Sequence, residues 1–215
     1  MTKVQSLAHG ASTLLVTAGV VALTYVGYVA METSAYQADQ RLMFAEARRS
    51  STPAAAVPAD GEWLGEIEVP RLGIDVGVVQ GESPLLLQRA AGHVTDTPLP
   101  GEMGNVVFAA HRDTFFRPLE HVRAGDDITV RTLAGDFHYV VESTIVVGPD
   151  DLWVLAPIGG RTLTLITCFP FGYIGAAPDR FVVRAREAPV RGALEEPFRH
   201  DDGVPPGGRA PAQLP

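Results

Sequence analysis

The feature that most constrains this chain is a long stretch near its N-terminus without a charged side chain. No Asp, Glu, Lys or Arg occurs between Lys3 and Glu32, and residues 11–30 within that gap are apolar, small or aromatic. A helix over those residues rises about 30 Å, which matches the hydrocarbon core of a bilayer. We therefore predict one transmembrane helix over residues 11–30, after a short tail over residues 1–10.

A cleaved signal peptide is the alternative to this anchor. Its apolar stretch would be long for a signal peptide, and residues 33–35 (TSA) make a poor cleavage site.

The orientation of the helix in the membrane also has two interpretations. Only Lys3 precedes the stretch, whereas three arginines follow it: Arg41, Arg48 and Arg49. By the positive-inside rule alone, the rest of the chain would lie in the cytoplasm.

Three further segments have compositions typical of connections or tails. Residues 31–49 are rich in good helix formers, so we predict that they extend the helix as a stalk. Residues 50–60 (SSTPAAAVPAD) form a Pro/Ala linker in which that helix should end. Residues 188–215 are dense in Pro and Gly and lack apolar periodicity, which predicts a disordered tail.

Residues 61–187 have the pattern of a β domain. Runs rich in Val, Ile, Leu and Thr alternate with Gly, Pro, Asp and Asn clusters, and no strand–helix alternation occurs. We predict an all-β fold, a closed β-barrel of seven or eight strands with one or two short helices. One helix is expected over residues 83–90, capped by Ser83, and turns are expected at residues 104–105 and 134–135. The predicted strands are residues 66–69, 74–79, 106–110, 127–132, 137–147, 161–167 and 180–186.

Charge and cysteine content exclude several function classes. The net charge of −8 and the sequence pI near 5.2 argue against a nucleic-acid binder. The single cysteine can form neither an intramolecular disulfide nor a cysteine-rich zinc site. We expect no cofactor and no metal. The acidic pairs at residues 126–127 and 150–151 could indicate calcium, but turn residues are the simpler interpretation.

That cysteine, Cys168, is the candidate nucleophile. It ends an apolar strand, where a barrel can present reactive groups, although a buried structural thiol is the alternative. A cysteine nucleophile needs a proton partner. His111 also lies at a strand-to-loop junction, so both can face one rim. His93 is second choice and is more simply a loop residue bonded to backbone. The remaining histidines are expected in the flanks or on the surface: His9, His121, His138 and His200.

Three motifs then occur in a specific order: AAHRDTFF at residues 109–116, TLITCFP at residues 164–170 and APDRFVVRA at residues 177–185. Together they resemble the active-site segments of sortases, the bacterial membrane-anchored cysteine transpeptidases. The stretch PLPGEMGNVVFAAH before the histidine is also similar to the family, and CFPFGYIGAAPDR is most similar to class D sortases. The resemblance covers residues 61–187, and the family's eight-stranded barrel agrees with the predicted strands.

The resemblance implies residue roles. It makes Cys168 the nucleophile, His111 the acid and base, and Arg180 the residue that stabilises the oxyanion. Strand alternation puts Arg184 on the face of Arg180, so we expect barrel curvature to move Arg184, a surface arginine, away from the site. Neighbouring residues are expected to bind substrate: Ala110, Arg112 and Thr167.

The resemblance also implies partners and a location. The substrates would be surface proteins with an LPxTG-like C-terminal sorting motif, and the acceptor would be an amine of the cell envelope or of another protein. The catalytic domain would lie on the extracytoplasmic side of the membrane, against the arginine count. Two alternatives stay open: a cysteine peptidase that releases its product to water, and a non-catalytic anchored binding module.

Overall fold

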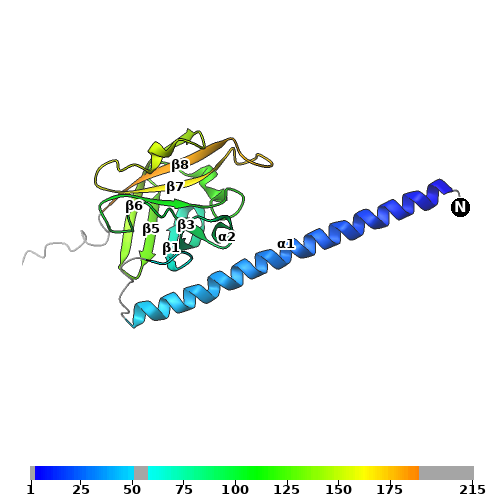
Figure 1. The fold of residues 1–215 in the computed structure, drawn as a ribbon, viewed down its shortest axis with the longest axis horizontal. Helices are drawn as coiled ribbons and strands as arrows, with labels where there is room; N and C mark the ends of the chain where they lie inside the picture. Colours follow the sequence, from blue (N-terminus) through cyan, green and yellow to red (C-terminus); the bar gives the residue numbers. More distant parts are fainter. Residues whose placement is uncertain (1–2, 51–57, 189–215) are drawn as a thin grey trace, which may run out of the picture.

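The computed structural model describes residues 3–50 and 58–188, which form a closed β-barrel and one long helix (Figure 1). The predicted tail from residue 189 onward and residues 51–57 of the predicted linker lie outside the described residues. The strand order around the barrel is β1-β2-β3-β4-β7-β8-β6-β5. The expected all-β closed barrel with few helices is thereby confirmed.

Most neighbouring strands are antiparallel, but β2 pairs with β3 and β4 pairs with β7 in parallel. These two pairings need chain connections that return to the same end of the barrel. The strands are β1 (Trp63–Val69), β2 (Ile74–Gln80), β3 (Ala91–His93), β4 (Gly104–Ala109), β5 (Asp127–Thr132), β6 (Asp136–Val147), β7 (Arg161–Phe169) and β8 (Asp179–Glu187). The helices are α1 (Lys3–Arg49), α2 (Pro84–Leu87) and the 3₁₀ turns η1 (Pro70–Leu72), η2 (Arg117–His121) and η3 (Leu152–Leu155).

Three local expectations differ from the structure. Strand β3 has only 3 residues and was not predicted, because so short a run carries no alternation. Gly104 and Asn105 open strand β4 instead of forming a turn. The predicted helix over residues 83–90 shrinks to α2, and Ser83 precedes it without a side-chain capping bond.

Alternation along the strands separates the barrel interior from its outer face. In β4 the core contains Val106 and Phe108, and in β7 it contains Leu163 and Leu165. The intervening residues therefore point outward. On the outer face, a second small cluster contains Val154 of η3 and Val182 of β8. The connection between β6 and β7 thus covers part of the outer face of the barrel.

Asn105 attaches that connection to the sheet. Its amide Nδ2 donates to the backbone oxygens of Val154 at 3.1 Å and Leu155 at 3.2 Å. Its Oδ1 accepts from the hydroxyls of Thr164 at 2.7 Å and Thr162 at 3.3 Å. The side chain is fully buried, so these bonds replace water for every polar atom it carries.

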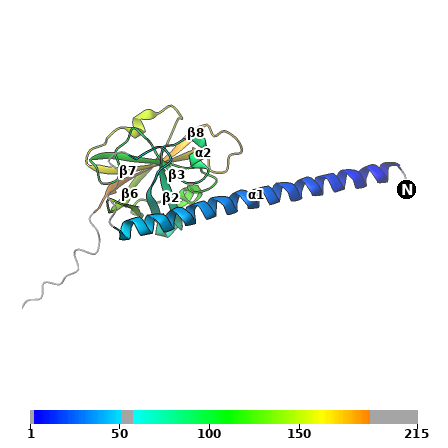
Figure 2. The ribbon, with the colours of Figure 1, turned by 60° about the horizontal axis from the view of Figure 1, so that its bottom comes forward.

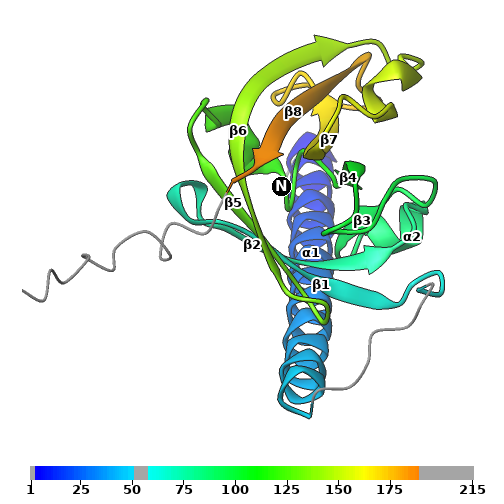
Figure 3. The same ribbon diagram turned by 90° about the vertical axis from the view of Figure 1, so that its left-hand side faces the viewer.

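Helix α1 is continuous over 47 residues and runs beside β1 and β2, as Figures 2 and 3 show from two sides. Its last third packs on the barrel. Arg41 Nη2 donates to Asp75 Oδ1 at 2.8 Å, and Arg41 Nε lies 3.3 Å from Glu66 Oε1. Arg48 pairs with Asp136 at 2.8 Å, and Phe44 is buried. Residues 31–49 are therefore helical, as predicted, but lie along the barrel instead of standing free of it.

The side chains of the apolar part of α1 are exposed instead. Its large side chains are exposed along one long helical segment that is apolar enough to cross a membrane. A helix whose apolar residues face outward all round is typical of a membrane span. The helix is thus a candidate membrane anchor whose C-terminal part packs on the surface of the barrel.

We expect Asn105→Leu to destabilise the barrel without changing its fold. Leucine keeps the volume but leaves buried backbone oxygens of the β6–β7 connection without a donor, which lowers the free energy of unfolding by about 1–3 kcal/mol. Urea unfolding followed by fluorescence measures this. Ser143→Ala, at an exposed position of β6, is the control and should change little. Equal stabilities of the Asn105 variant and the wild type would contradict this role.

Candidate active site

The pairing of three strands aligns the residues named from the sequence. Across β7 and β8, Cys168 is the direct partner of Arg180. Strands β4 and β7 are parallel, and Ala109 pairs with Ile166 in the last matched position. Continuing this parallel register by two residues along both strands, we infer that His111 lies beside Cys168. The three residues form one row across the end of the sheet, which we call the His–Cys–Arg row.

The His–Cys–Arg row faces outward. Phe108 and Leu165, three residues before His111 and Cys168, belong to the core, so an odd number of residues later the side chains point to the outer face. All three side chains are partly exposed. Cys168 is a free thiol of intermediate exposure, which differs from the fully buried thiol of the alternative interpretation. A substrate can reach it from outside the barrel.

The guanidinium of Arg180 is held by the loop that precedes it. Its Nη1 donates to the backbone oxygens of Asp179 at 3.0 Å and Ala177 at 3.4 Å. Within residues 3–50 and 58–188 these bonds use Nη1 alone, so Nη2 and Nε can donate to an incoming group. An arginine held in this way offers two donors in fixed geometry.

Thr167 and Ala110 connect the two strands directly behind the row. The Thr167 hydroxyl donates to the Ala110 backbone oxygen at 2.8 Å, and both residues are buried. This bond joins β7 and the end of β4 one residue before Cys168 and His111. Substrate contact by Thr167 and Ala110 stays a prediction, while their mutual bond restrains the backbones next to Cys168 and His111.

Arginines from the segment after β4 hold the β7–β8 loop. Arg112 Nη2 donates to the backbone oxygens of Tyr173 at 2.5 Å and Gly175 at 3.0 Å. Arg117 donates to the backbone oxygen of Phe171. The loop between Cys168 and Arg180 is thus tied to the segment that carries His111. Arg112 as a substrate-binding residue stays a prediction, because its guanidinium is engaged here with the loop.

His93 is a structural residue, and the expectation that it lies in a loop is wrong. It ends strand β3 and is only 1% exposed. Its Nδ1 lies 2.9 Å from Gln80 Oε1, and its Nε2 lies 3.0 Å from the Pro98 backbone oxygen. Burial lowers the pKa of His93 below its usual value. The neutral ring is enclosed by its neighbours and cannot exchange protons with a substrate on the outer face.

Arg184 also differs from expectation, since it is buried and not a surface arginine. Its side chain is 7% exposed, donates to the Thr164 hydroxyl at 3.3 Å and lies 5.9 Å from the ring centre of Trp153. It shares the outer face with Arg180, but it pairs with Thr164 instead of Cys168. The four residues from Arg180 to Arg184 span about 13 Å along β8. This distance alone separates Arg184 from the His–Cys–Arg row, without the barrel curvature that we expected.

In each acidic pair considered for calcium, one carboxylate has a partner within the protein. Arg71 bonds the carboxylate of Asp126, and this bond holds the pKa of Asp126 below its usual value. Asp151 Oδ2 accepts from the backbone N–H of Gly148 at 2.7 Å. Among the described residues, no group of three or more His, Cys, Asp or Glu side chains is arranged to hold a metal ion.

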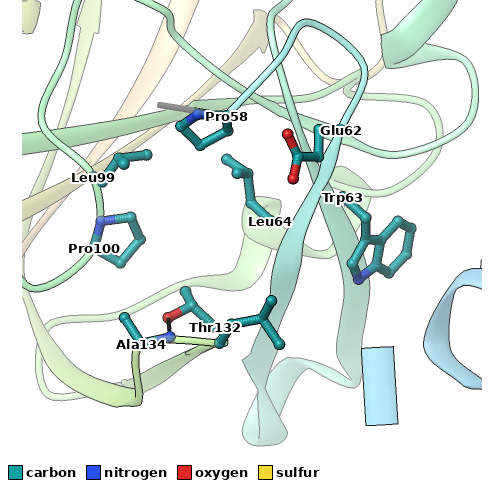
Figure 4. A pocket seen from close by; sticks show the side chains of 9 residues that line it. Pro58, Glu62, Trp63, Leu64, Leu99, Pro100, Thr132 and Ala134 are labelled. Carbon is teal, nitrogen blue, oxygen red and sulfur yellow. Dashed lines mark hydrogen bonds between the residues drawn. The ribbon is translucent and has the colours of Figure 1, made fainter. Parts of the chain in front are cut away.

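The barrel surface has two hollows of interest, and one of them contains a residue of the site. One lies at the opposite end of the barrel, between the start of β1 and the segment before β4, and is lined by apolar residues that include Leu64, Leu99 and Pro100 (Figure 4). The other contains His111 itself, where the segment after β4 approaches Val29 and Thr33 of α1. Only the second hollow involves the His–Cys–Arg row.

Sequence reasoning did not identify Asn105 and Arg117 as residues that support the site. Asn105 was assigned to a turn because Gly-Asn pairs are common there. Arg117 begins η2 and binds a backbone oxygen more than fifty residues away in sequence. No short-range pattern could reveal either contact, because both depend on where distant segments meet.

Comparison with known proteins gives one consistent result. The family model described as Sortase domain matches residues 67–188. Sortase D of Bacillus subtilis is 29% identical over 184 residues, which cover 79% of this chain and 93% of the relative. The solved structure of a Clostridium perfringens sortase D5 transpeptidase has a TM-score of 0.60 at 26% identity, covering 74% of this chain and 98% of that one. Sortase A from Corynebacterium diphtheriae has a TM-score of 0.58 at 27% identity, with coverages of 63% and 65%.

We expect the buried His93 to make stability depend on pH. The native ring is neutral and has a lowered pKa, whereas the unfolded chain binds a proton near pH 6.5. Stability is therefore complete above that pH and falls as the pH drops below it, by at most about 1.4 kcal/mol per pH unit. Urea unfolding of the wild type and of His93→Gln between about pH 7 and 5 measures this.

His93→Gln should be less stable at neutral pH but should show a shallower loss on acidification. His121→Gln is the control, because His121 is exposed and its replacement should leave the slope unchanged. The same slope in His93→Gln and in the wild type would contradict the assignment of a buried neutral ring.

Proposed function

The chain belongs to the sortase family of cysteine transpeptidases, and from that premise we propose that it cleaves a C-terminal sorting motif and transfers the acyl group to an amine. The proposed substrates are surface proteins with an LPxTG-like motif, and the proposed acceptor is an amine of the cell envelope or of another protein. The observation that carries the proposal is the His–Cys–Arg row, in which Cys168 lies between His111 and Arg180 on the outer face.

In the first half-reaction, the Cys168 thiolate attacks the carbonyl carbon of the scissile peptide bond. The carbonyl electron pair moves onto oxygen, and donors of Arg180 stabilise the resulting oxyanion. When the intermediate collapses, the C=O bond forms again and the C–N bond breaks. Protonated His111 gives its proton to the departing nitrogen. A thioester on Cys168 remains, and the released peptide carries the new amine.

In the second half-reaction, the acceptor amine attacks the thioester carbon and gives a proton to His111. The C–S bond then breaks, which restores the Cys168 thiolate and protonated His111 and completes a new amide. The same residues can pass the acyl group to water, which is the alternative function of a cysteine peptidase. The two differ only in which nucleophile reaches the thioester first.

Hydrogen bonds beside the His–Cys–Arg row support its proposed catalytic role. The bond between Thr167 and Ala110 restrains the backbones that carry Cys168 and His111. Bonds from Arg112 and Arg117 restrain the loop that leads to Arg180. Residues that are held before substrate binds lose little freedom when the transition state forms.

We further propose that α1 anchors the enzyme by a single membrane span, with the barrel on the extracytoplasmic side. The arginine count after the span opposes this orientation. However, Arg41 pairs with Asp75 and Glu66, and Arg48 pairs with Asp136. These two arginines belong to the surface of a folded domain that follows the span, and long domains cross the membrane largely regardless of their charge, so the arginine count weighs little here.

A peptide bearing an LPxTG-like motif should be cleaved by the full chain in detergent, and an added amine should appear in the product. Cys168→Ala should abolish both cleavage and transfer, because alanine keeps the fold and removes the nucleophile. Mass spectrometry of the products measures this, with His121→Ala as the control. Cleavage that yields only the free acid at every amine concentration would favour the peptidase. Cleavage by Cys168→Ala would disprove the assigned nucleophile.

Arg180→Lys should fail almost as severely as Arg180→Ala in single-turnover acylation. Lysine keeps the charge but lacks the planar pair of donors, and loss of an oxyanion donor costs about 10²–10³ in rate. Arg186→Ala is the matched control: Arg186 is an exposed arginine of the same strand and face and pairs with Glu142. Arg184 is unsuitable as a control because it is buried. Near-normal acylation by the lysine variant would mean that Arg180 supplies only positive charge.

A further inference from the structure

The β7–β8 loop exposes apolar side chains that the proposed chemistry does not use. Residues 169–178 (FPFGYIGAAP) contain no charged side chain. At the tip of the loop, Ile174 is 97% exposed and Tyr173 is 47% exposed. Phe169, the last residue of β7, and Phe171 in the loop pack on Phe181 at the barrel end. The loop is therefore anchored at its base and presents its tip away from the barrel.

The loop tip lies on the side of the barrel from which the apolar part of α1 extends. In Figures 1 and 2 the loop before β8 projects in the direction of the N-terminus. Arg112 bonds the backbone of Tyr173 and Gly175 and so joins the tip to the segment after β4. That segment meets the end of the apolar stretch, in the hollow lined by Val29 and His111.

The Arg112 bonds and the hollow beside Val29 place the loop level with the C-terminal end of the proposed membrane-spanning segment of α1. If residues 11–30 cross the bilayer, the hollow beside Val29 lies at the membrane surface. We propose that Tyr173 and Ile174 enter the interface of the phospholipid bilayer that α1 spans, as a second attachment of the barrel. This inference rests on the proposed membrane anchor. Isoleucine removes apolar surface from water there, and tyrosine suits the boundary between headgroups and hydrocarbon.

The surrounding charges limit the depth of this contact. Asp113 lies in the same hollow, and Asp179 and Arg180 follow the loop. Charged groups are unfavourable in the hydrocarbon core, so the loop reaches the headgroup boundary and no deeper. A second attachment also restrains the tilt of the helix and barrel together against the bilayer, and the His–Cys–Arg row is then held at a constant height above the lipid.

Site-specific fluorescence on the full chain in vesicles tests this proposal. In a Cys168→Ala background, Ile174→Cys and Met103→Cys each supply one thiol for an environment-sensitive NBD label. Met103 is the matched control, since it is apolar, 68% exposed and located before β4 at the opposite end of the barrel. The vesicles contain phosphatidylcholine and phosphatidylglycerol, with or without lipids that carry a spin label near the headgroup.

In vesicles, the label at residue 174 should emit at a shorter wavelength than the same label on a short peptide in buffer without detergent. Spin-labelled lipids should quench its fluorescence. The label at residue 103 should show neither effect. If alkaline washing leaves the protein in the vesicles but both labels behave alike, the loop contact is disproved while the anchor stands. If alkaline washing removes the protein, the anchor itself is disproved, and the loop contact with it.

Discussion

The position of β7 between β4 and β8 is the constraint on which the rest of the site depends. Side chains alternate along a strand, so a slip of one residue in either pairing would turn Cys168 into the barrel interior. Leu163 and Leu165 oppose such a slip, because it would expose them. Hydrogen bonds from Thr167 to the Ala110 backbone oxygen and from the β7 hydroxyls of Thr162 and Thr164 to Asn105 Oδ1 reinforce the same register. Apolar and polar contacts therefore specify a single alignment of the His–Cys–Arg row.

Once that register is set, the loops around the row are held mainly through backbone oxygens. Arg112, Arg117 and Arg180 each donate to carbonyl groups of the β7–β8 loop, and Asn105 does the same for the β6–β7 connection. These loops are rich in Gly and Pro and have few strand partners, so side-chain donors must satisfy their backbone. The contacts depend little on which side chains the loops carry, which leaves the loop residues free to differ in shape and polarity.

Sequence patterns predicted the parts of this fold that depend on local alternation. Seven strands and the positions of His111 and Cys168 at strand ends follow from runs such as VVFAAH and TLITC, in which apolar residues and a terminal polar residue are adjacent. Strand β3 was missed because its 3 residues gain order only from β2 and β4. The burial of His93 and Arg184 depends on neighbours that lie far away in sequence, so polarity alone assigned both of them wrongly to loops or the surface.

The same distinction between local composition and distant contacts applies to the two parts of α1. Its first part is apolar on all sides, which composition predicts, whereas its last part carries arginines that a charge count treats as free. In the folded chain Arg41 and Arg48 match carboxylates of β1, β2 and β6, and Gln37 donates to the backbone oxygen of Arg89 at 2.8 Å. A helix bound in this way cannot act as a flexible spacer. Because its 19 residues beyond residue 30 lie along the barrel, and rise only about 28 Å, the end of the barrel that carries the row stays close to the end of the span.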